Sequence, residues 1–222
     1  MTSAVPRSPL GRGVPSLEVR WILPGRLDTA VVARFAASGA YMESREDAYL
    51  LRPDLDALSV KVRGGRALEV KMFLGSPGIL DLQGRARGHM QSWQKWSFPF
   101  RPLSQDASEA EGWRRVRKQR RIMRFAHTGG RITPAEASAR ELVDEARCAV
   151  ELTEVRTHHG DWWSFALEAT GPAGLLRAGL EATAALVFTQ VPPGDFELRL
   201  ADSMSYAEWL RPRLRAEGHA SA

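Results

Sequence analysis

Charged and apolar side chains alternate along two short runs at residues 58–71, and a Gly-Gly pair separates the runs. Successive side chains of a β-strand point to opposite faces, so Lys61 and Arg63 share one face of a predicted strand. Glu69 and Lys71 share one face of the next strand. The glycines suit the positive φ of a tight hairpin turn, so three bases and one acid would lie side by side. Such a group suits phosphate oxygens, although the water-facing side of an ordinary antiparallel sheet has the same pattern.

The same alternation recurs in other parts of the chain, each time opposite an apolar face. The predicted strands and their charged residues are 16–23 with Glu18 and Arg20, 148–155 with Glu151, and 162–170 with Glu168. In an open sheet these charged faces would meet water, whereas in a closed barrel they would line a polar lumen. Lys and Arg bind phosphate oxygens, and carboxylates bind Mg²⁺ or Mn²⁺. A lumen with both kinds of charge therefore suits a polyanion held together with a divalent metal.

The most basic segment is 113–125, in which seven of thirteen residues are Arg or Lys. As a helix it would be basic almost all round, and as a strand it would be charged on both faces at its centre, so periodicity leaves both open. It could also form an outer nucleic-acid-binding surface. In that case charge reversal at Arg115 and Arg117 should abolish binding, while Lys61→Ala should leave it intact. The plain alternative is a strand whose basic face is merely solvated.

The order of these motifs resembles the CYTH superfamily, the triphosphate tunnel metalloenzymes, which include class IV adenylyl cyclases, thiamine triphosphatases and inorganic tripolyphosphatases. The similar segments, in chain order, are 16–20 (the family's opening Glu-x-Glu-x-Lys strand), 60–63 and 68–71 (its Leu-Arg-Ile-Arg and Thr-Leu-Lys hairpin), 116–120 (its Lys-x-Arg strand), 151–153 (Glu-Leu-Asp) and 166–168 (Glu-x-Glu). The resemblance favours a strand at 113–125, with Lys118 and Arg120 facing inward.

The resemblance implies an α+β protein of mainly antiparallel β-structure, folded as a closed tunnel-like β-barrel of about eight strands with helices packed outside. It also implies a lumen that binds a triphosphate or polyphosphate, and a metal-dependent triphosphatase activity with Mg²⁺ or Mn²⁺. The phosphate-binding residues would be Arg20, Lys61, Arg63, Lys71, Lys118 and Arg120. The metal ligands would be Glu18, Glu69, Glu151 and Glu168. No residue is singled out as a catalytic acid or base.

Three positions depart from the family pattern in the same direction. Ser16 stands where the family has the first Glu of its opening motif, Thr153 where an Asp is usual, and Ala166 at a position that is often acidic. Glu69 stands at a position that the family often fills with Thr. The lumen thus keeps its phosphate-binding charge better than its metal-binding charge. This leaves open a non-catalytic protein that binds phosphate, a nucleotide or an RNA end.

Length and composition indicate one domain without disulfides. The 222 residues suffice for one large barrel, which we expect at 16–218, after a disordered tail rich in Pro, Gly, Ser and Arg at 1–15. The net charge of +5 favours anionic partners such as a phosphorylated small molecule, polyphosphate or nucleic acid. The single cysteine, Cys148, excludes an intramolecular disulfide and a zinc site with several cysteines. No apolar stretch of about 18 residues occurs, so we expect no membrane span and a cytoplasmic protein, whose oligomeric state stays open.

The remaining segments predict helices, short strands and a loop. Apolar residues at helical spacing predict helices at 27–38, 175–188 and 206–215. Residues 49–51 and the aromatic segment 91–100 predict short strands. Residues 75–90 hold four glycines and one proline, which is typical of a loop.

His158, His159 and several Trp residues have two interpretations each. The histidines lie in a predicted turn, where a metal site would need a third ligand from elsewhere, so an exposed loop pair is the simpler interpretation. Tryptophans such as Trp93 could stack a nucleobase at the tunnel mouth or fill the core. Alternation requires at least one of Trp162 and Trp163 to face outward from the lumen, under a helix.

Overall fold

The computed structural model describes residues 13–99, 112–135, 145–190 and 197–211. Within these ranges the strands are β1 (Val14–Pro24), β2 (Tyr41–Leu50), β3 (Leu58–Arg63), β4 (Ala67–Asp81), β5 (Arg87–Pro99), β6 (Trp113–Thr128), β7 (Arg131–Pro134), β8 (Ala146–Thr157) and β9 (Gly160–Thr170). The helices are α1 (Thr29–Ala37), α2 (Ala173–Gln190) and the short 3₁₀ helix η2 (Leu200–Asp202). Residues 206–211 are also helical, and we call them the C-terminal helix. None of the helices in the described ranges is long and apolar enough to cross a membrane.

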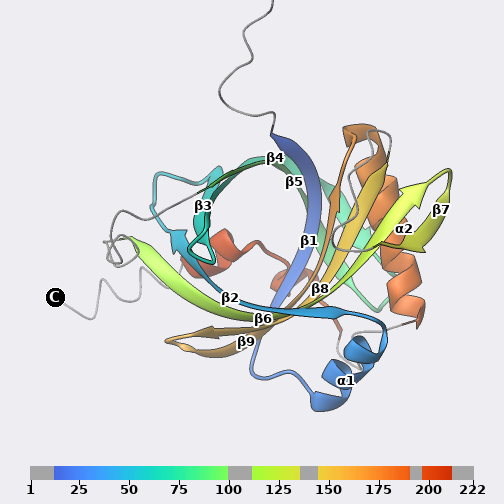
Figure 1. The fold of residues 1–222 in the computed structure, drawn as a ribbon, viewed down its shortest axis with the longest axis horizontal. Coiled ribbons are helices and arrows are strands. Elements are labelled where there is room, and N and C mark those ends of the chain that lie inside the picture. The colour runs from blue at the N-terminus through green and yellow to red at the C-terminus, as the bar shows by residue number, and fades with distance from the viewer. Residues whose placement is uncertain (1–12, 100–111, 136–144, 191–196, 212–222) are drawn as a thin grey trace, which may run out of the picture.

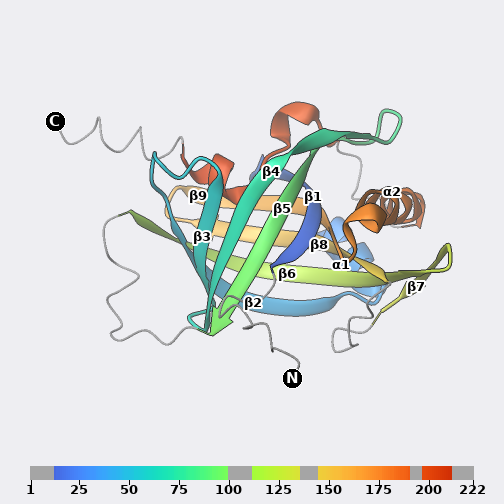
Figure 2. The ribbon, with the colours of Figure 1, turned by 90° about the horizontal axis from the view of Figure 1, so that it is seen from above.

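Eight of these strands close into one antiparallel barrel. Their order is β2-β3-β4-β5-β1-β9-β8-β6, and β6 pairs with β2 to complete the circle, while β7 forms a hairpin with the end of β6. Figure 1 looks into the ring of strands, and Figure 2 shows α2 lying outside it. The closed tunnel-like barrel with helices packed outside, which the CYTH resemblance implies, is confirmed.

The outer face of the barrel carries the main apolar core. Val19, Trp21 and Phe165 are fully buried there, in a cluster that includes residues of α1 and α2. The Phe165 ring meets Phe35 of α1 edge-on at 6.3 Å and Phe188 of α2 edge-on at 5.6 Å. Edge-to-face aromatic pairs of this kind add to the stabilisation from buried area. Because the helices cover the apolar face of these strands, the charged face points into the barrel.

Two local features position elements of this core. Asp28 caps the start of α1 by accepting a hydrogen bond from a first-turn backbone N–H at 2.6 Å, and Gly39, with a φ of 81°, follows its end. On β5, a Cβ added to Gly88 would lie 2.6 Å from atoms of both Trp21 and Val19. A residue without a side chain therefore lets Trp21 pack closely over β5.

A second, smaller core lies at one end of the barrel, under the C-terminal helix. Tyr206, Trp209 and Leu210 pack there in a buried cluster with Ile22 and Tyr49. Ile22 and Tyr49 belong to the inward-facing rows of their strands, and the helix is visible through the ring of strands in Figure 1. The C-terminal helix therefore covers one end of the lumen.

The prediction of a loop at 75–90 is wrong. Strands β4 and β5 run through most of this segment, and two of its glycines lie at irregularities of the pairing. The register of the β4–β5 pairing shifts between Phe73 and Gly75 and again between Gly75 and Gly78. The φ angle is 126° at Gly75 and 139° at Gly78. Glycine adopts such angles without strain and is common at bulges, which bend a strand without ending it. The glycines therefore curve the barrel wall here.

The other predicted elements within the described ranges are present, with shifted ends. The segment 113–125 is a strand, β6, rather than a helix, and β2 has ten residues where only 49–51 were expected. The predicted tail falls mostly on residues 1–12, and the ends of the predicted helix and domain fall on 212–218. These residues lie outside the described ranges, so those predictions stay predictions.

Candidate functional site

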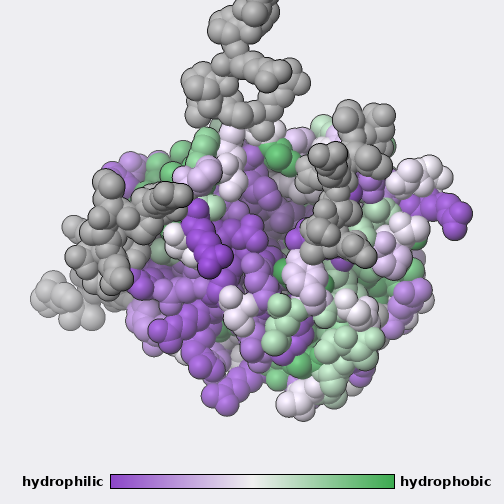
Figure 3. Space-filling view, in the orientation of Figure 1, coloured by the Kyte–Doolittle hydropathy of each residue, from purple (hydrophilic) through white to green (hydrophobic). Residues whose placement is uncertain are grey.

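All ten residues predicted for the site line one cavity in the lumen of the barrel. They come from six strands, β1, β3, β4, β6, β8 and β9. Cross-strand pairing puts them on the same face, since Glu18 lies opposite Glu168 and Lys61 lies opposite Glu69. Figure 3 shows hydrophilic residues gathered over the hollow of the ring. The inward direction of these side chains is as predicted, while their roles stay predictions.

The lumen contains further charged residues that the sequence prediction missed. Strand β2 contributes Glu43, Arg45 and Asp47, and β5 contributes Lys95. The sequence does contain the pattern, because Glu43, Arg45 and Asp47 occupy every second position of β2, as the charged residues of the other strands do. Polar Ser44 and Glu46 occupy the outer face of the same strand and hid the alternation.

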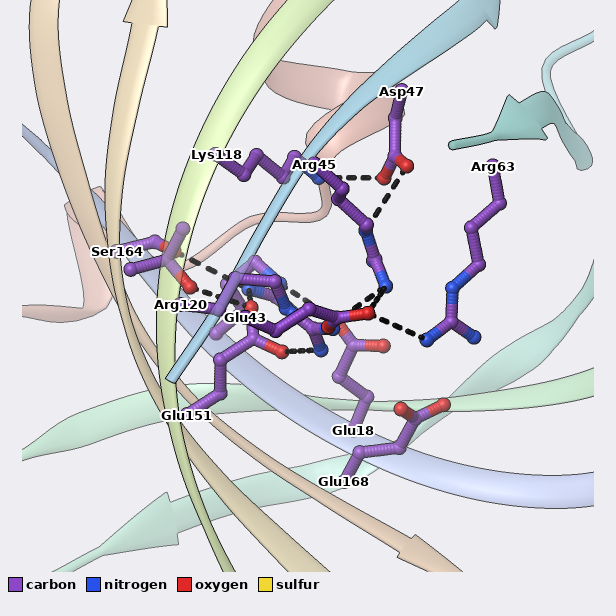
Figure 4. A network of polar contacts seen from close by, with 12 residues as sticks. Glu18, Glu43, Arg45, Asp47, Arg63, Lys118, Arg120, Glu151, Ser164 and Glu168 are labelled. Carbon is purple, nitrogen blue, oxygen red and sulfur yellow. Dashed lines mark hydrogen bonds and ion pairs between the residues drawn. The ribbon is translucent and has the colours of Figure 1, made fainter. Parts of the chain in front are cut away.

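Asp47 is the most buried charge of the lumen, and three basic side chains share it. It has no solvent exposure, and its carboxylate lies 3.0 Å from Arg45 Nε and 3.3 Å from the Nζ atoms of both Lys61 and Lys118. Figure 4 shows the Arg45 and Lys118 side chains converging on it. Lys118 also donates to Tyr49 Oη at 2.7 Å and lies 3.5 Å from the centre of the Tyr206 ring.

One carboxylate shared by three bases leaves positive charge undercompensated in this cluster. Burial by itself raises the pKa of Asp47, but Lys118, Lys61 and Arg45 outweigh it and hold the pKa far below its usual range. Burial lowers the pKa of Lys118 well below its usual value and also lowers that of Lys61, and Asp47 offsets only part of each shift. An added anion would stabilise both lysines.

Glu18 and Glu168 converge on Lys71 at the opposite wall. Lys71 Nζ lies 2.8 Å from an oxygen of each carboxylate, and Arg20 Nε lies 2.7 Å from Glu18 Oε1. Burial alone raises the pKa of both carboxyl groups, but Lys71 and the neighbouring bases more than offset this and lower the pKa of each. Both acids are therefore ionised and held by the ammonium group between them.

The other two predicted carboxylates are also paired with bases. Glu151 accepts from Arg120, from Arg20 at 3.4 Å and from Thr153 Oγ1 at 2.7 Å. Glu69 lies 3.1 Å from Lys61 Nζ and 3.0 Å from Arg63. Burial raises the pKa of Glu69, but these two bases outweigh it and bring the pKa to about 2.

Among the described residues, the central part of the lumen holds more bases than acids. The eight bases are Arg20, Arg45, Lys61, Arg63, Lys71, Lys95, Lys118 and Arg120. The six acids are Glu18, Glu43, Asp47, Glu69, Glu151 and Glu168. A buried charge without a counterion is costly, so two positive charges in excess favour an anion in this space.

The free space is divided between the centre of the lumen and the end away from the C-terminal helix. The central cavity has a volume of about 80 Å³, because long side chains cross the lumen to reach their partners. A cavity of about 210 Å³ at the far end shares Arg20 and Arg120 with it and adds Arg124 and Arg147. A space of 80 Å³ holds only a few waters, so a larger anion must displace carboxylates from their bases.

The carboxylates as placed do not form a metal site. Each of Glu18, Glu69, Glu151 and Glu168 accepts from at least one basic side chain. Within the described part of the chain, no group of three or more His, Cys, Asp or Glu side chains is arranged to hold a metal ion. Divalent cations bind to converging oxygens with little competing positive charge, so these residues do not fit a preformed Mg²⁺ or Mn²⁺ site. Metal binding by these four residues stays a prediction.

The histidines, the cysteine and the adjacent tryptophans lie on the surface or pack in one of the two cores, whereas Trp93 lines the central cavity. His158 and His159 are exposed in the turn between β8 and β9, as the simpler interpretation expected. Cys148 is fully buried, and burial raises the pKa of its thiol to about 12, so it is a packed thiol. Trp163 belongs to the outer core, which confirms that one of the two adjacent tryptophans faces outward, whereas Trp162 packs edge-on against Trp209 at 5.3 Å.

Comparisons with known proteins give distant structural likenesses. No family model matches the sequence, and no curated protein matches it. Among solved structures, the chain is similar to the PH1819 protein from Pyrococcus horikoshii OT3, with 12% identity over 88% of this chain and 97% of that chain and a TM-score of 0.44. It is also similar to the S. pombe Pct1 RNA triphosphatase in complex with the Spt5 CTD, with 9% identity over 82% of this chain and 81% of that chain and a TM-score of 0.40. Because these scores are low, the function must be inferred from the lumen residues themselves.

Proposed function

We propose that the barrel lumen binds the triphosphate or polyphosphate part of a phosphorylated small molecule, or polyphosphate itself. The observation that carries this proposal is the excess of bases over acids in one buried space, with three bases sharing Asp47. A phosphate chain supplies several anionic oxygens along a line, which suits bases projecting from strands all round a lumen. Arg20, Lys61, Arg63, Lys71, Lys118 and Arg120 would bind it, together with Arg45 and Lys95.

The lumen carboxylates have a part in this proposal as internal counterions. Without a ligand they hold the bases at defined positions, as Glu18 and Glu168 hold Lys71. An entering polyanion would take over the bases, and the displaced carboxylates would turn toward water at the open end. Exchange of one set of anionic oxygens for another keeps the bases compensated throughout, so binding need not expose an unpaired buried charge.

Two versions of the proposal differ in the fate of the bound ligand. In the first, the protein would hydrolyse the bound triphosphate with Mg²⁺ or Mn²⁺, and Glu18, Glu69, Glu151 and Glu168 would hold the metal ion. In the second, it binds a phosphate, a nucleotide or an RNA end without turnover. The pairing of each of these carboxylates with bases favours the second version.

The direct test measures tripolyphosphate binding by calorimetry for Lys61→Ala and for a matched control, Arg117→Ala. Lys61 lies in the lumen, whereas Arg117 lies on the outer face with a 77% exposed side chain that pairs with Glu46. Loss of a charge-assisted contact, roughly 1.5–3 kcal/mol, should weaken binding about 10- to 100-fold for Lys61→Ala, and Arg117→Ala should bind like wild type. If Arg117→Ala weakens binding as much, the outer basic surface is the site and the lumen proposal fails.

The two versions are separated by turnover. Tripolyphosphate, ATP and thiamine triphosphate would each be incubated with the protein and Mg²⁺ or Mn²⁺, and phosphate release measured beside an active control enzyme. Tight binding in the presence of EDTA, with no phosphate released from any of the three, would support the non-catalytic version. Metal-dependent release from any of them would support the hydrolase.

A further inference from the structure

Among the described residues, two uncharged polar side-chain atoms on the barrel strands are buried and have no hydrogen-bond partner: Trp93 Nε1 on β5 and Ser16 Oγ on β1. Ser16 has no solvent exposure, and Trp93 is 5% exposed. A buried polar group left without a partner is uncommon and costs stability, so each such group calls for an explanation.

These two atoms belong to neighbouring residues on the inner face. Ser16 and Trp93 are directly opposite each other across the β1–β5 pairing. Ser16 lies in the same alternating row of β1 as Glu18 and Arg20, and Trp93 lines the central cavity. Both side chains therefore belong to the lumen wall rather than to the outer core.

Two lysines flank this pair along the same wall. Lys71 on β4 and Lys95 on β5 are cross-strand partners, and the next inward pair along these strands is Phe73 and Trp93. Lys71 sits 2.8 Å from Glu168, whereas Lys95 lies 3.8 Å from the same carboxylate oxygen. Lys95 is thus held more weakly than Lys71 and is available to a ligand.

The chemistry of these groups defines what they can bind. An indole N–H only donates, and an ammonium only donates, so the partner must offer acceptors. The ring of Phe73 packs on Trp93 with centroids 5.1 Å apart at an interplanar angle of 57°, which occupies part of the indole surface and orients its N–H. This arrangement favours a hydrogen bond from the Trp93 edge over stacking of a nucleobase on the ring.

We propose that Ser16 and Trp93 form an uncharged donor subsite for the oxygens of one phosphoryl group, with Lys71 and Lys95 as its cationic side. This inference rests on the proposed function and adds residues to its site. A tetrahedral oxyanion has acceptor oxygens in several directions, so one group can receive the indole N–H, the hydroxyl and an ammonium together. A bridging water would satisfy the two orphaned atoms without any role in ligand binding, and affinity measurements on variants of these residues separate the two cases.

The test compares Trp93→Phe and Ser16→Ala with Trp96→Phe in calorimetric titrations with tripolyphosphate. Trp96 is on the same strand but in the opposite, outward-facing row, so its substitution makes the same chemical change away from the lumen. Trp93→Phe keeps an aromatic ring against Phe73 and removes the donor together with part of the indole ring, whereas Ser16→Ala removes only the hydroxyl. We expect roughly 10- to 100-fold weaker binding for Trp93→Phe and for Ser16→Ala, with Trp96→Phe unchanged.

Thermal unfolding without ligand gives a second readout, because stability should not fall where affinity does. Removing a hydroxyl that has no partner should leave the melting temperature of Ser16→Ala equal to that of wild type or above it, so weaker binding by this variant cannot be ascribed to a damaged fold. Tight binding by wild type with unchanged affinity in Trp93→Phe and Ser16→Ala would overturn the subsite alone. A wild-type protein that does not bind tripolyphosphate would overturn the proposed function itself.

Discussion

Asp47→Asn is the substitution for which the structure makes the sharpest prediction, because two measured quantities should move in opposite directions. The substitution keeps the shape of the side chain and removes its charge. Arg45, Lys61 and Lys118 then lose their shared counterion at a position with no solvent exposure. Removing one partner of a buried ion pair typically costs about 3–5 kcal/mol of stability, so we expect a loss of this size in the ligand-free protein.

Affinity for a polyanion should rise in the same variant. Asp47 competes with an incoming phosphate chain for the same three bases, and it also repels the chain directly. Two like charges about 8 Å apart at an effective dielectric constant near 20 repel each other by about 2 kcal/mol, which corresponds to a factor of roughly 30 in affinity. A saturating anion should therefore restore much of the lost stability, since binding to the folded state alone stabilises it.

The assay is urea unfolding with and without tripolyphosphate, together with calorimetric titration at pH 7. The matched control is Glu46→Gln on the same strand, because Glu46 is on the outer face and pairs with Arg115 and Arg117 at 3.1 Å each. Exposed pairs of this kind contribute about 0–1 kcal/mol, so this control should change stability slightly and affinity not at all. Asp47→Asn with wild-type stability, or with weaker tripolyphosphate binding, would refute the charge-excess explanation of the lumen.

The remaining predictions concern pH and packing. Burial lowers the pKa of Lys118 and Lys61, which face Asp47, Arg45, Tyr49 and Tyr206, and a bound anion would raise both values. The protein should therefore take up protons when it binds tripolyphosphate. Its affinity, measured in buffers of increasing pH, should fall as the pH rises through the pKa values that the two lysines have without ligand. An affinity that is independent of pH up to about pH 10 would contradict this. In the same window the unfolded chain binds more protons at these lysines than the folded one, so their contribution to ligand-free stability should rise with pH. Gly88→Ala should cost about 1–3 kcal/mol of stability in urea unfolding, because its Cβ would lie 2.6 Å from atoms of Trp21 and Val19. It should leave tripolyphosphate affinity unchanged, since both contacts are on the outer face. An affinity loss larger than about threefold would show that the outer core and the lumen are not independent.

The sequence was most informative where one face of a strand was uniformly charged and the other uniformly apolar. Lys61 with Arg63, and Glu18 with Arg20, could be placed on a lumen face because the residues between them are apolar. Strand β2 failed this criterion, since Ser44 and Glu46 are polar on its outer face, and so Asp47 was missed although it is the most buried charge. The glycines at 75–90 indicated loop by composition, while the pairing of β4 with β5 uses Gly75 and Gly78 as irregularities within a strand.

The position of the C-terminal helix could not be predicted for a different reason. Its apolar periodicity indicates a helix but not the surface it covers, because that depends on contacts with strands distant in the sequence. Tyr206 illustrates this, since its ring lies 3.5 Å from Lys118 Nζ and its hydroxyl lies 2.8 Å from Ser164 Oγ. Nothing local to residue 206 indicates a role in the lumen.

The acid–base pairing of the lumen also explains why so many carboxylates are present in a site proposed for anions. Eight bases in a buried space without counterions would destabilise the fold by repulsion and desolvation. Six acids make the ligand-free barrel stable, and each acid also competes with the ligand for the bases. Stability of the empty barrel and affinity for the anion are therefore opposed at Asp47, the one acid that three bases share. They are not opposed at Trp93, whose N–H is uncharged and has no partner to give up. Loss of the Asp47 charge should thus weaken the fold and strengthen binding, whereas loss of the unpartnered hydroxyl of Ser16, beside Trp93, should weaken binding and leave the fold intact.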